Sequence, residues 1–226
     1  MKNPWIKSFV RREGRITLRQ KQALENYWLS YGLSLEQGII HFGEIFGSEA
    51  PVTLEIGFGM GDSLANQAKA EPFTGFIGVE IYRPGIGHLL DRLYEEQIHN
   101  VRIYQNDVVE VLNQCIPNNS LDRVQIFFPD PWPKRRHHKR RLIQAEFIAL
   151  LEPKLKAGAR LHLATDWENY AQQMMRMLSQ QPFLENCFDH HQFMIGNVRQ
   201  DKTKFEKRGE RLGHHVWELM FIKKGF

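Results

Sequence analysis

The sequence lacks the features that mark secreted and membrane-bound proteins. Among 226 residues there are only two cysteines, Cys115 and Cys187, and their spacing matches neither a disulfide framework nor a zinc site. No apolar run approaches the roughly 20 residues that cross a bilayer. The first 21 residues hold seven Lys or Arg against one Glu and contain no apolar secretory segment. These absences predict a cytoplasmic protein that is not anchored in a membrane.

A resident metal ion is not expected either. The ten histidines include three doublets that lie far apart in the sequence, and no H-E-x-x-H or comparable ligand spacing occurs. Nothing in the sequence requires a protein partner. The formal net charge is only +4, but the positive charge is clustered, and it is the local field of such a cluster that attracts a polyanion.

Strand and helix signals alternate from residue 52 to about residue 181. Strands are predicted over residues 52–56, 76–79, 101–104, 121–128 and 159–165. Helices are predicted over 62–70, 85–97, 108–115, 143–151 (ended by Pro153) and 170–178. Repeated strand–helix units with short links indicate an α/β domain, with a mostly parallel central sheet and helices on both faces. Two strand-like runs, 187–195 and 215–222, predict an antiparallel C-terminal hairpin at the sheet edge.

The chain length fits one domain with an arm. Residues 1–50 are interpreted as a basic N-terminal arm, in which residues 24–30 form a short helix. Residues 51–226 are interpreted as the α/β domain.

A glycine-rich loop follows the first strand of the domain. It reads E-I-G-F-G-M-G-D over residues 55–62, with glycine at 57, 59 and 61. Glycine allows a sharp turn and the close approach of a ligand. A dinucleotide fingerprint would need glycine at position 62, where Asp62 would repel a pyrophosphate at the helix N-terminus. The loop therefore argues against a dinucleotide, and Asp62 is either a helix cap or part of a site for another ligand.

Acidic residues recur at the ends of three successive predicted strands. Glu55 lies in the end of the first strand, Glu80 ends the second, and Asn106-Asp107 follow the third. An acid at the position of Glu80 is where ribose hydroxyls are bound in such sheets. Each acid alone could be a cap or a solvated strand end, but all three together predict a nucleoside site.

The most informative stretch follows the fourth predicted strand. It reads F-P-D-P-W-P-K over residues 128–134, and six Lys or Arg fall within residues 134–141. Proline cannot continue a central strand, so Asp130 is presented at the strand end with limited backbone freedom. A carboxylate beside a phosphate-binding surface indicates an enzyme that acts on nucleic acid, whereas the alternative is a solvated loop with a structural Asp-Pro turn. Trp132 either stacks on a displaced base or packs between Pro131 and Pro133.

These motifs carry a resemblance that covers roughly residues 50–222. The acidic glycine loop resembles that of class I S-adenosylmethionine-dependent methyltransferases. Together with residues 128–134, Thr165-Asp166-Trp167 and the T-K-F-E stretch at 203–206, it resembles the bacterial tRNA (guanine-N7-)-methyltransferase family. The resemblance implies a Rossmann-like fold, S-adenosylmethionine as cofactor and tRNA as partner. It further implies methylation of guanine N7 at position 46 of the tRNA variable loop.

The resemblance also implies roles for individual residues. Asp130 would be the catalytic residue. The cofactor would be bound by Glu55, Gly57, Gly59, Gly61, Glu80, Asn106, Asp107 and Asp130. The substrate would contact Lys134, Asp166, Thr203, Lys204, Phe205 and Glu206. RNA would contact Arg135, Arg136, His137, His138, Lys139, Arg140 and Arg141.

Two other functions remain open on the sequence. One is a non-catalytic RNA-binding module, against which the complete set of acids and glycines argues. The other is a methyltransferase of small molecules or proteins on the same fold, since a fold does not fix its substrate. The basic stretch at 134–141 argues against this second function.

Overall fold

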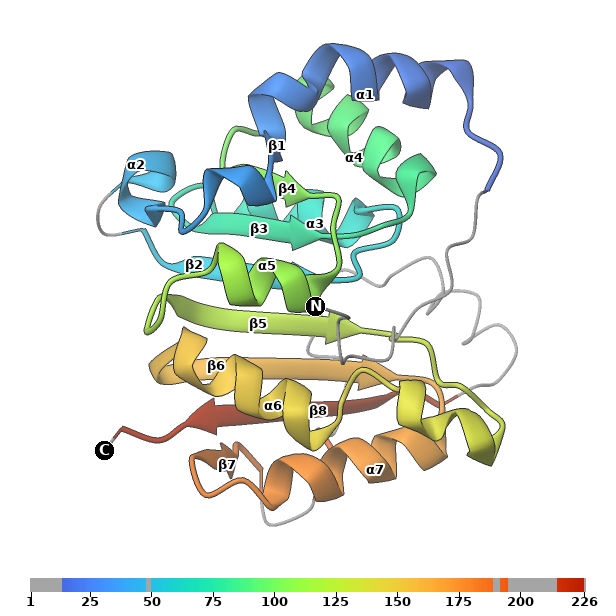
Figure 1. Cartoon of the computed structure of the whole chain (residues 1–226), viewed down its shortest axis with the longest axis vertical. Coiled ribbons are helices and arrows are strands. Elements are labelled where there is room, and N and C mark those ends of the chain that lie inside the picture. Colours follow the sequence, from blue (N-terminus) through green and yellow to red (C-terminus); the bar gives the residue numbers. More distant parts are fainter. Residues whose placement is uncertain (1–13, 48–49, 189–191, 195–214, 226) are drawn as a thin grey trace.

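The computed structural model describes residues 14–47, 50–188, 192–194 and 215–225 of the chain. Its centre is an eight-stranded sheet with the order β1-β4-β3-β2-β5-β6-β8-β7 (Figure 1). The strands are β1 (Gly32–Leu33), β2 (Val52–Ile56), β3 (Gly75–Val79), β4 (Val101–Tyr104), β5 (Leu121–Phe127), β6 (Leu155–Thr165), β7 (Leu184–Asn186) and β8 (Trp217–Lys223).

The sheet is parallel except for its last two strands, β8 and β7. All pairings among β1 to β6 are parallel, whereas β8 is antiparallel to β6, and β7 is antiparallel to β8. This confirms the predicted mostly parallel sheet with an antiparallel C-terminal hairpin. In the described part of the chain the first strand of the hairpin is Leu184–Asn186, which lies before the predicted run 187–195, and residues 189–191 and 195 of that run lie outside the described residues.

Helices connect the strands. They are α1 (Leu18–Tyr31), α2 (Phe42–Phe46), α3 (Asp62–Ala70), α4 (Arg83–Glu95), α5 (Val108–Gln114), α6 (Ala145–Leu151) and α7 (Glu168–Ser179). Short 3-10 helices span Leu35–Gln37, Arg135–Arg140 and Glu152–Lys154. In Figure 1, α5 and α6 cross in front of the sheet while α3 lies behind it. None of the helices in the described ranges is long and apolar enough to cross a membrane.

Both faces of the sheet are buried, and β3 shows how. Phe76 packs into one apolar cluster with Leu64 of α3 and Leu89 of α4. Its neighbour Ile77 points to the opposite face and joins the cluster that contains Leu112 of α5. Because successive strand side chains alternate between faces, a strand apolar at both positions requires helices on both sides.

The N-terminal region is more closely integrated than the sequence suggests. Helix α1 begins at Thr17, whose side chain accepts from the backbone N–H of Gln20, and Gln20 reciprocates in a capping box. Arg19 donates to Asp91 of α4 at 2.6 Å, and β1 extends the sheet beside β4. Within residues 17–47 the structure thus has a helix that contacts α4 and an edge strand that pairs with β4, while the division into two parts at residue 50 stays a prediction. Residues 1–13 of the predicted arm lie outside the described residues.

Candidate active site

Several of the predicted site residues follow the carboxyl ends of the parallel strands. β2, β3, β4, β5 and β6 are parallel neighbours, so their carboxyl ends meet at one edge of the sheet. In an open α/β sheet this edge is where ligands bind. Glu80 follows β3, Asn106 and Asp107 follow β4, Asp130 follows β5 and Asp166 follows β6.

The glycine loop between β2 and α3 adopts a backbone that suits only glycine. Gly57, Gly59 and Gly61 have φ of 75°, 60° and 79°. A Cβ added at Gly57 or Gly59 would meet nothing within 4 Å, so these two positions face open space. At Gly61 a Cβ would come within 2.8 Å of Leu89, so this glycine serves the packing of the loop on α4. The loop thus presents bare backbone to a ligand.

Glu80, which follows β3, contacts the glycine loop. Its carboxylate accepts from the backbone N–H of Gly59 at 2.8 Å, of Ile81 at 2.7 Å and of Tyr82 at 3.1 Å. Burial raises the pKa of Glu80, and the negative charge of Asp130 adds to this, whereas the three N–H donors act in the opposite direction. A half-buried carboxylate in this position favours a ligand that donates hydrogen bonds to it.

The remaining cofactor candidates occupy the adjacent strand ends. Glu55 is 3% exposed within β2. Asp107 is the N-cap of α5 and accepts from the N–H of Val109 at 3.0 Å. Asn106 is half-buried beside it. Asp107 therefore has a structural role as a cap in addition to the binding role predicted for it.

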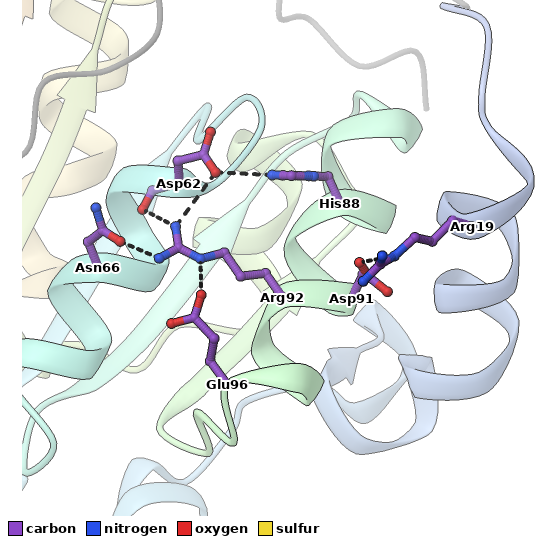
Figure 2. A network of polar contacts seen from close by, with 7 residues as sticks. All are labelled: Arg19, Asp62, Asn66, His88, Asp91, Arg92 and Glu96. Carbon is purple, nitrogen blue, oxygen red and sulfur yellow. Dashed lines mark hydrogen bonds and ion pairs between the residues drawn. The ribbon is translucent and has the colours of Figure 1, made fainter.

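Asp62 belongs to a different network (Figure 2). Gly61, and not Asp62, is the N-cap of α3, and the carboxylate of Asp62 lies 3.0 Å from Nε2 of His88. Arg92 of α4 donates to the backbone carbonyl of Asp62 at 3.0 Å and to Glu96 at 2.5 Å, and it also contacts Asn66. The network connects α3, the helix that follows the glycine loop, to α4. The side chain of Asp62 is therefore not the cap of α3.

The Asp130 loop is held in an uncommon backbone conformation. Phe128 and Trp132 have φ of 51° and 45°, values that residues other than glycine rarely adopt. The N–H of Phe128 donates to the carbonyl of Ala164 in β6 at 2.8 Å, which ties the start of the loop to the neighbouring strand. Such backbone persists only where its surroundings determine it, and it clusters at functional sites.

The basic stretch forms the 3-10 helix Arg135–Arg140. Lys134, Arg135, Arg136, Lys139 and Arg140 are all exposed, as expected of a surface that contacts phosphate. The guanidinium of Arg140 lies over the ring of Trp132, 5.0 Å from its centroid, and His137 meets the edge of the same ring. Partial burial and the nearby cations, Arg136 first among them, lower the pKa of His137.

Arg141 corrects one prediction. It is 2% exposed, although the sequence placed it among the RNA-contacting residues. Its guanidinium donates inward to the carbonyl of Pro131, to Gln173 and to Asn169, and its Nη2 lies 3.1 Å from Nε2 of His138. A side chain used in this way is not available to RNA phosphates.

The predicted substrate contacts are described only in part. Lys134, directly before the 3-10 helix Arg135–Arg140, and Asp166, directly after β6, are both exposed. Thr203, Lys204, Phe205 and Glu206 lie outside the described residues. Among the residues that the structure does describe, no group of three or more His, Cys, Asp or Glu is arranged to hold a metal ion.

Comparisons with known proteins decide the family. The family model "Putative methyltransferase" matches residues 49–219. The tRNA (guanine-N(7)-)-methyltransferase of Nitrosococcus oceani is 53% identical over 216 residues, which cover 96% of this chain and 90% of the relative. That of Idiomarina loihiensis is 51% identical over 216 residues and covers 96% and 88%. This chain belongs to the tRNA (guanine-N(7)-)-methyltransferase family.

Solved structures of other methyltransferases have the same fold as this chain. A 16S rRNA (adenine(1408)-N(1))-methyltransferase from Catenulisporales acidiphilia, solved with cosubstrate SAM, aligns with a TM-score of 0.57 at 14% identity, covering 85% of this chain and 92% of that one. An rRNA methylase from Streptococcus thermophilus aligns with a TM-score of 0.53 at 11% identity, covering 81% and 92%. At these identities the likeness concerns the fold, which is the class I methyltransferase fold predicted from the sequence.

Two parts of the site of this methyltransferase were not predicted from the sequence. A Cβ at Gly85 would approach the carbonyl oxygen of Gly59 within 1.8 Å, so the glycine loop needs a glycine in the first turn of α4. The Pro84-Gly85 pair at a helix start was the available signal. Gln173 and Asn169, which bind Arg141, lie on the polar side of α7, and no sequence pattern singles them out.

Proposed function

We propose that this protein transfers a methyl group from S-adenosylmethionine to N7 of guanine in tRNA, at position 46 of the variable loop. The observation that carries the proposal is the Asp130 loop, which lies between an acidic ligand space and an exposed basic surface. About half of the residues are shared with relatives named for this activity over nearly the whole chain.

The residues fit the proposed cofactor by charge and shape. Gly57 and Gly59 leave room for a ligand against the backbone. Glu80 would accept from the ribose hydroxyls, Asp130 adds negative charge near it, and Glu55 and Asp107, at the neighbouring strands β2 and β4, would contribute further negative charge. S-adenosylmethionine has no phosphate and carries a cationic amino group and sulfonium, so an acidic pocket attracts it.

The proposed chemistry needs no proton transfer before methylation. S-adenosylmethionine, when bound, supplies an electrophilic methyl group. Guanine N7 carries a lone pair at neutral pH and forms the new N–CH3 bond with that pair, while the electrons of the broken C–S bond stay with sulfur. The product base is cationic. The task of the protein is therefore to align the base and to favour the positive charge that develops on it.

Asp130 is the residue proposed for the second task. Its carboxylate is presented by a loop of fixed conformation and lies near Glu80, whose pKa its negative charge raises. A preorganised negative group beside the purine favours the transition state more than the neutral ground state. The exposed cations of residues 134–140 would hold the phosphates of the tRNA.

A single assay tests the proposal. The purified protein is incubated with S-adenosylmethionine and unmodified tRNA, and the tRNA is then digested with a nuclease and analysed by mass spectrometry. The expected product is one 7-methylguanosine per tRNA, in the fragment that contains position 46. Methyl transfer to another nucleotide would refute the position, and transfer only to small molecules or proteins would refute the substrate class.

A further inference from the structure

Arg141 is the buried member of the basic stretch, and we propose that it is a positioning residue that fixes the Asp130 loop to helix α7 for methyl transfer. This role rests on the proposed function. The side chain is 2% exposed, whereas its neighbours Lys139 and Arg140 are exposed. A guanidinium taken out of water must place its N–H donors on acceptors inside the protein, because unpaired buried donors are costly.

The guanidinium joins two segments that are distant in sequence. On the loop, Nε donates to the carbonyl of Pro131 at 2.8 Å. On α7, Nη1 donates to Oε1 of Gln173 at 2.6 Å, and Nη2 donates to Oδ1 of Asn169 at 3.0 Å. One planar group thus connects the residue that follows Asp130 to the first half of α7.

A buried aromatic ring fixes the plane of this group. The guanidinium carbon of Arg141 lies 4.7 Å from the ring centroid of Tyr170, which is 0% exposed. The hydroxyl of Tyr170 accepts from the backbone N–H of Ile143 at 3.1 Å. Burial raises the pKa of that hydroxyl, the positive charge of Arg141 lowers it, and the negative charge of Asp130 raises it.

The position of this connection determines its effect on the site. The carbonyl of Pro131 lies between Asp130 and Trp132, inside the segment whose ends have positive φ, and such backbone needs external support. Helix α7 follows Asp166 after a single residue, so the same guanidinium connects the loop that follows β5 to the helix that follows β6. A displacement of about 1 Å in a reacting group can lower a rate by about 100-fold.

The test is Arg141→Lys, which keeps the charge but removes the planar fork of donors. We expect the single-turnover rate of guanine methylation at saturating tRNA and S-adenosylmethionine to fall about 10- to 100-fold. The Kd values of both ligands and the salt dependence of tRNA binding should stay at wild-type values, because a buried guanidinium contacts no phosphate. Arg176→Lys, an exposed arginine on the same α7, is the matched control and should match the wild type in every measurement.

A second variant protects the test against a folding defect. Gln173→Met removes one acceptor of Arg141 from α7 without touching the loop, and it should lower the single-turnover rate in the same way by a smaller factor. The role is overturned if folded Arg141→Lys keeps the wild-type rate, or if it loses tRNA affinity and salt dependence instead. It is also overturned if Arg141→Lys does not fold and Gln173→Met retains the full rate. A wild-type protein that methylates no guanine in tRNA would refute the proposed function, and with it this role.

Discussion

The two halves of the proposed site are built by different means. The cofactor half is made of backbone: three glycines with positive φ, and a carboxylate that accepts from three N–H groups. The substrate half depends on one buried side chain, since Arg141 ties the Asp130 loop to α7. A site formed by backbone can be predicted from the glycine pattern of the sequence. A site that a buried side chain holds in place is harder to predict, because the sequence does not tell which of several neighbouring arginines is buried.

The largest expected effect is in the substrate half. Asp130→Asn keeps the shape of the side chain and removes its charge, so the transition state loses electrostatic stabilisation. We expect the single-turnover rate to fall on the order of 100- to 1,000-fold, while tRNA binding changes little. Asp122→Asn, at the opposite end of β5, is the matched control. An equal rate loss in both variants would mean that the effect comes from stability instead.

The next effect concerns the cofactor half. Glu80→Ala removes a charged acceptor from the ligand space, and charge-assisted hydrogen bonds contribute about 1.5–3 kcal/mol. We expect the Kd for S-adenosylmethionine to rise by roughly 10- to 100-fold in calorimetry. Glu95→Ala, on the exposed side of α4, should bind the cofactor like the wild type. Unchanged affinity in Glu80→Ala would remove Glu80 from the site.

The exposed cations should act on tRNA alone. Replacing Arg135, Arg136 and Arg140 with Gln, and leaving Arg141 in place, should weaken tRNA binding. The salt dependence should flatten by about 0.7 to 0.9 log units for each phosphate that the protein no longer neutralises. Binding is measured by titration at several salt concentrations, and S-adenosylmethionine affinity is the internal control. An unaltered salt slope would show that these residues form only a solvated surface.

A smaller effect is expected when two N-terminal deletions are compared, one that ends before helix α1 and one that removes its start. Deleting residues 1–13 should lower tRNA affinity and leave cooperative unfolding unchanged. Deleting residues 1–19 also removes the Thr17 cap and the exposed Arg19–Asp91 pair. The cap contributes about 1 kcal/mol, and the longer deletion should therefore lower Tm by about 2–4 °C relative to the shorter one. Equal Tm values for the two deletions would show that the start of α1 adds nothing to stability.

The smallest expected effect is a loss of folding stability at low pH through Glu96, which belongs to the network around Asp62 and Arg92. Hydrogen bonds from Arg92 and Lys69 lower the pKa of Glu96 to about 2. A carboxyl whose folded pKa is depressed stabilises the fold above its unfolded pKa, and this contribution is lost as pH falls from about 4.5 towards 2. Glu96→Gln should therefore flatten the decline of unfolding free energy between those pH values in urea titrations. A decline as steep as that of the wild type would exclude Glu96 as a contributor.

The sequence predicts the cofactor half better than the substrate half for physical reasons. Short, mainly apolar runs define β2, β3 and β4, because strands buried on both faces are apolar at most positions. The start of α1 was missed because residues 18–23 have no apolar periodicity, although Thr17 and Gln20 carry the capping-box signal. The first hairpin strand was misplaced because its pairing is set by tertiary contact with β8. Arg141 looks like its neighbours in the sequence, and only packing against Tyr170 distinguishes it.

The central claim is that the site favours a developing positive charge and removes no proton before methyl transfer. The most direct test is a single-turnover pH profile of the wild type and of Asp130→Asn, with methyl transfer as the observed step. We expect a wild-type rate without an ascending limb near neutrality, and a variant that is slower at every pH and not restored at high pH. A wild-type limb that titrates near neutrality and disappears in Asp130→Asn would show that Asp130 moves a proton, and would contradict this mechanism.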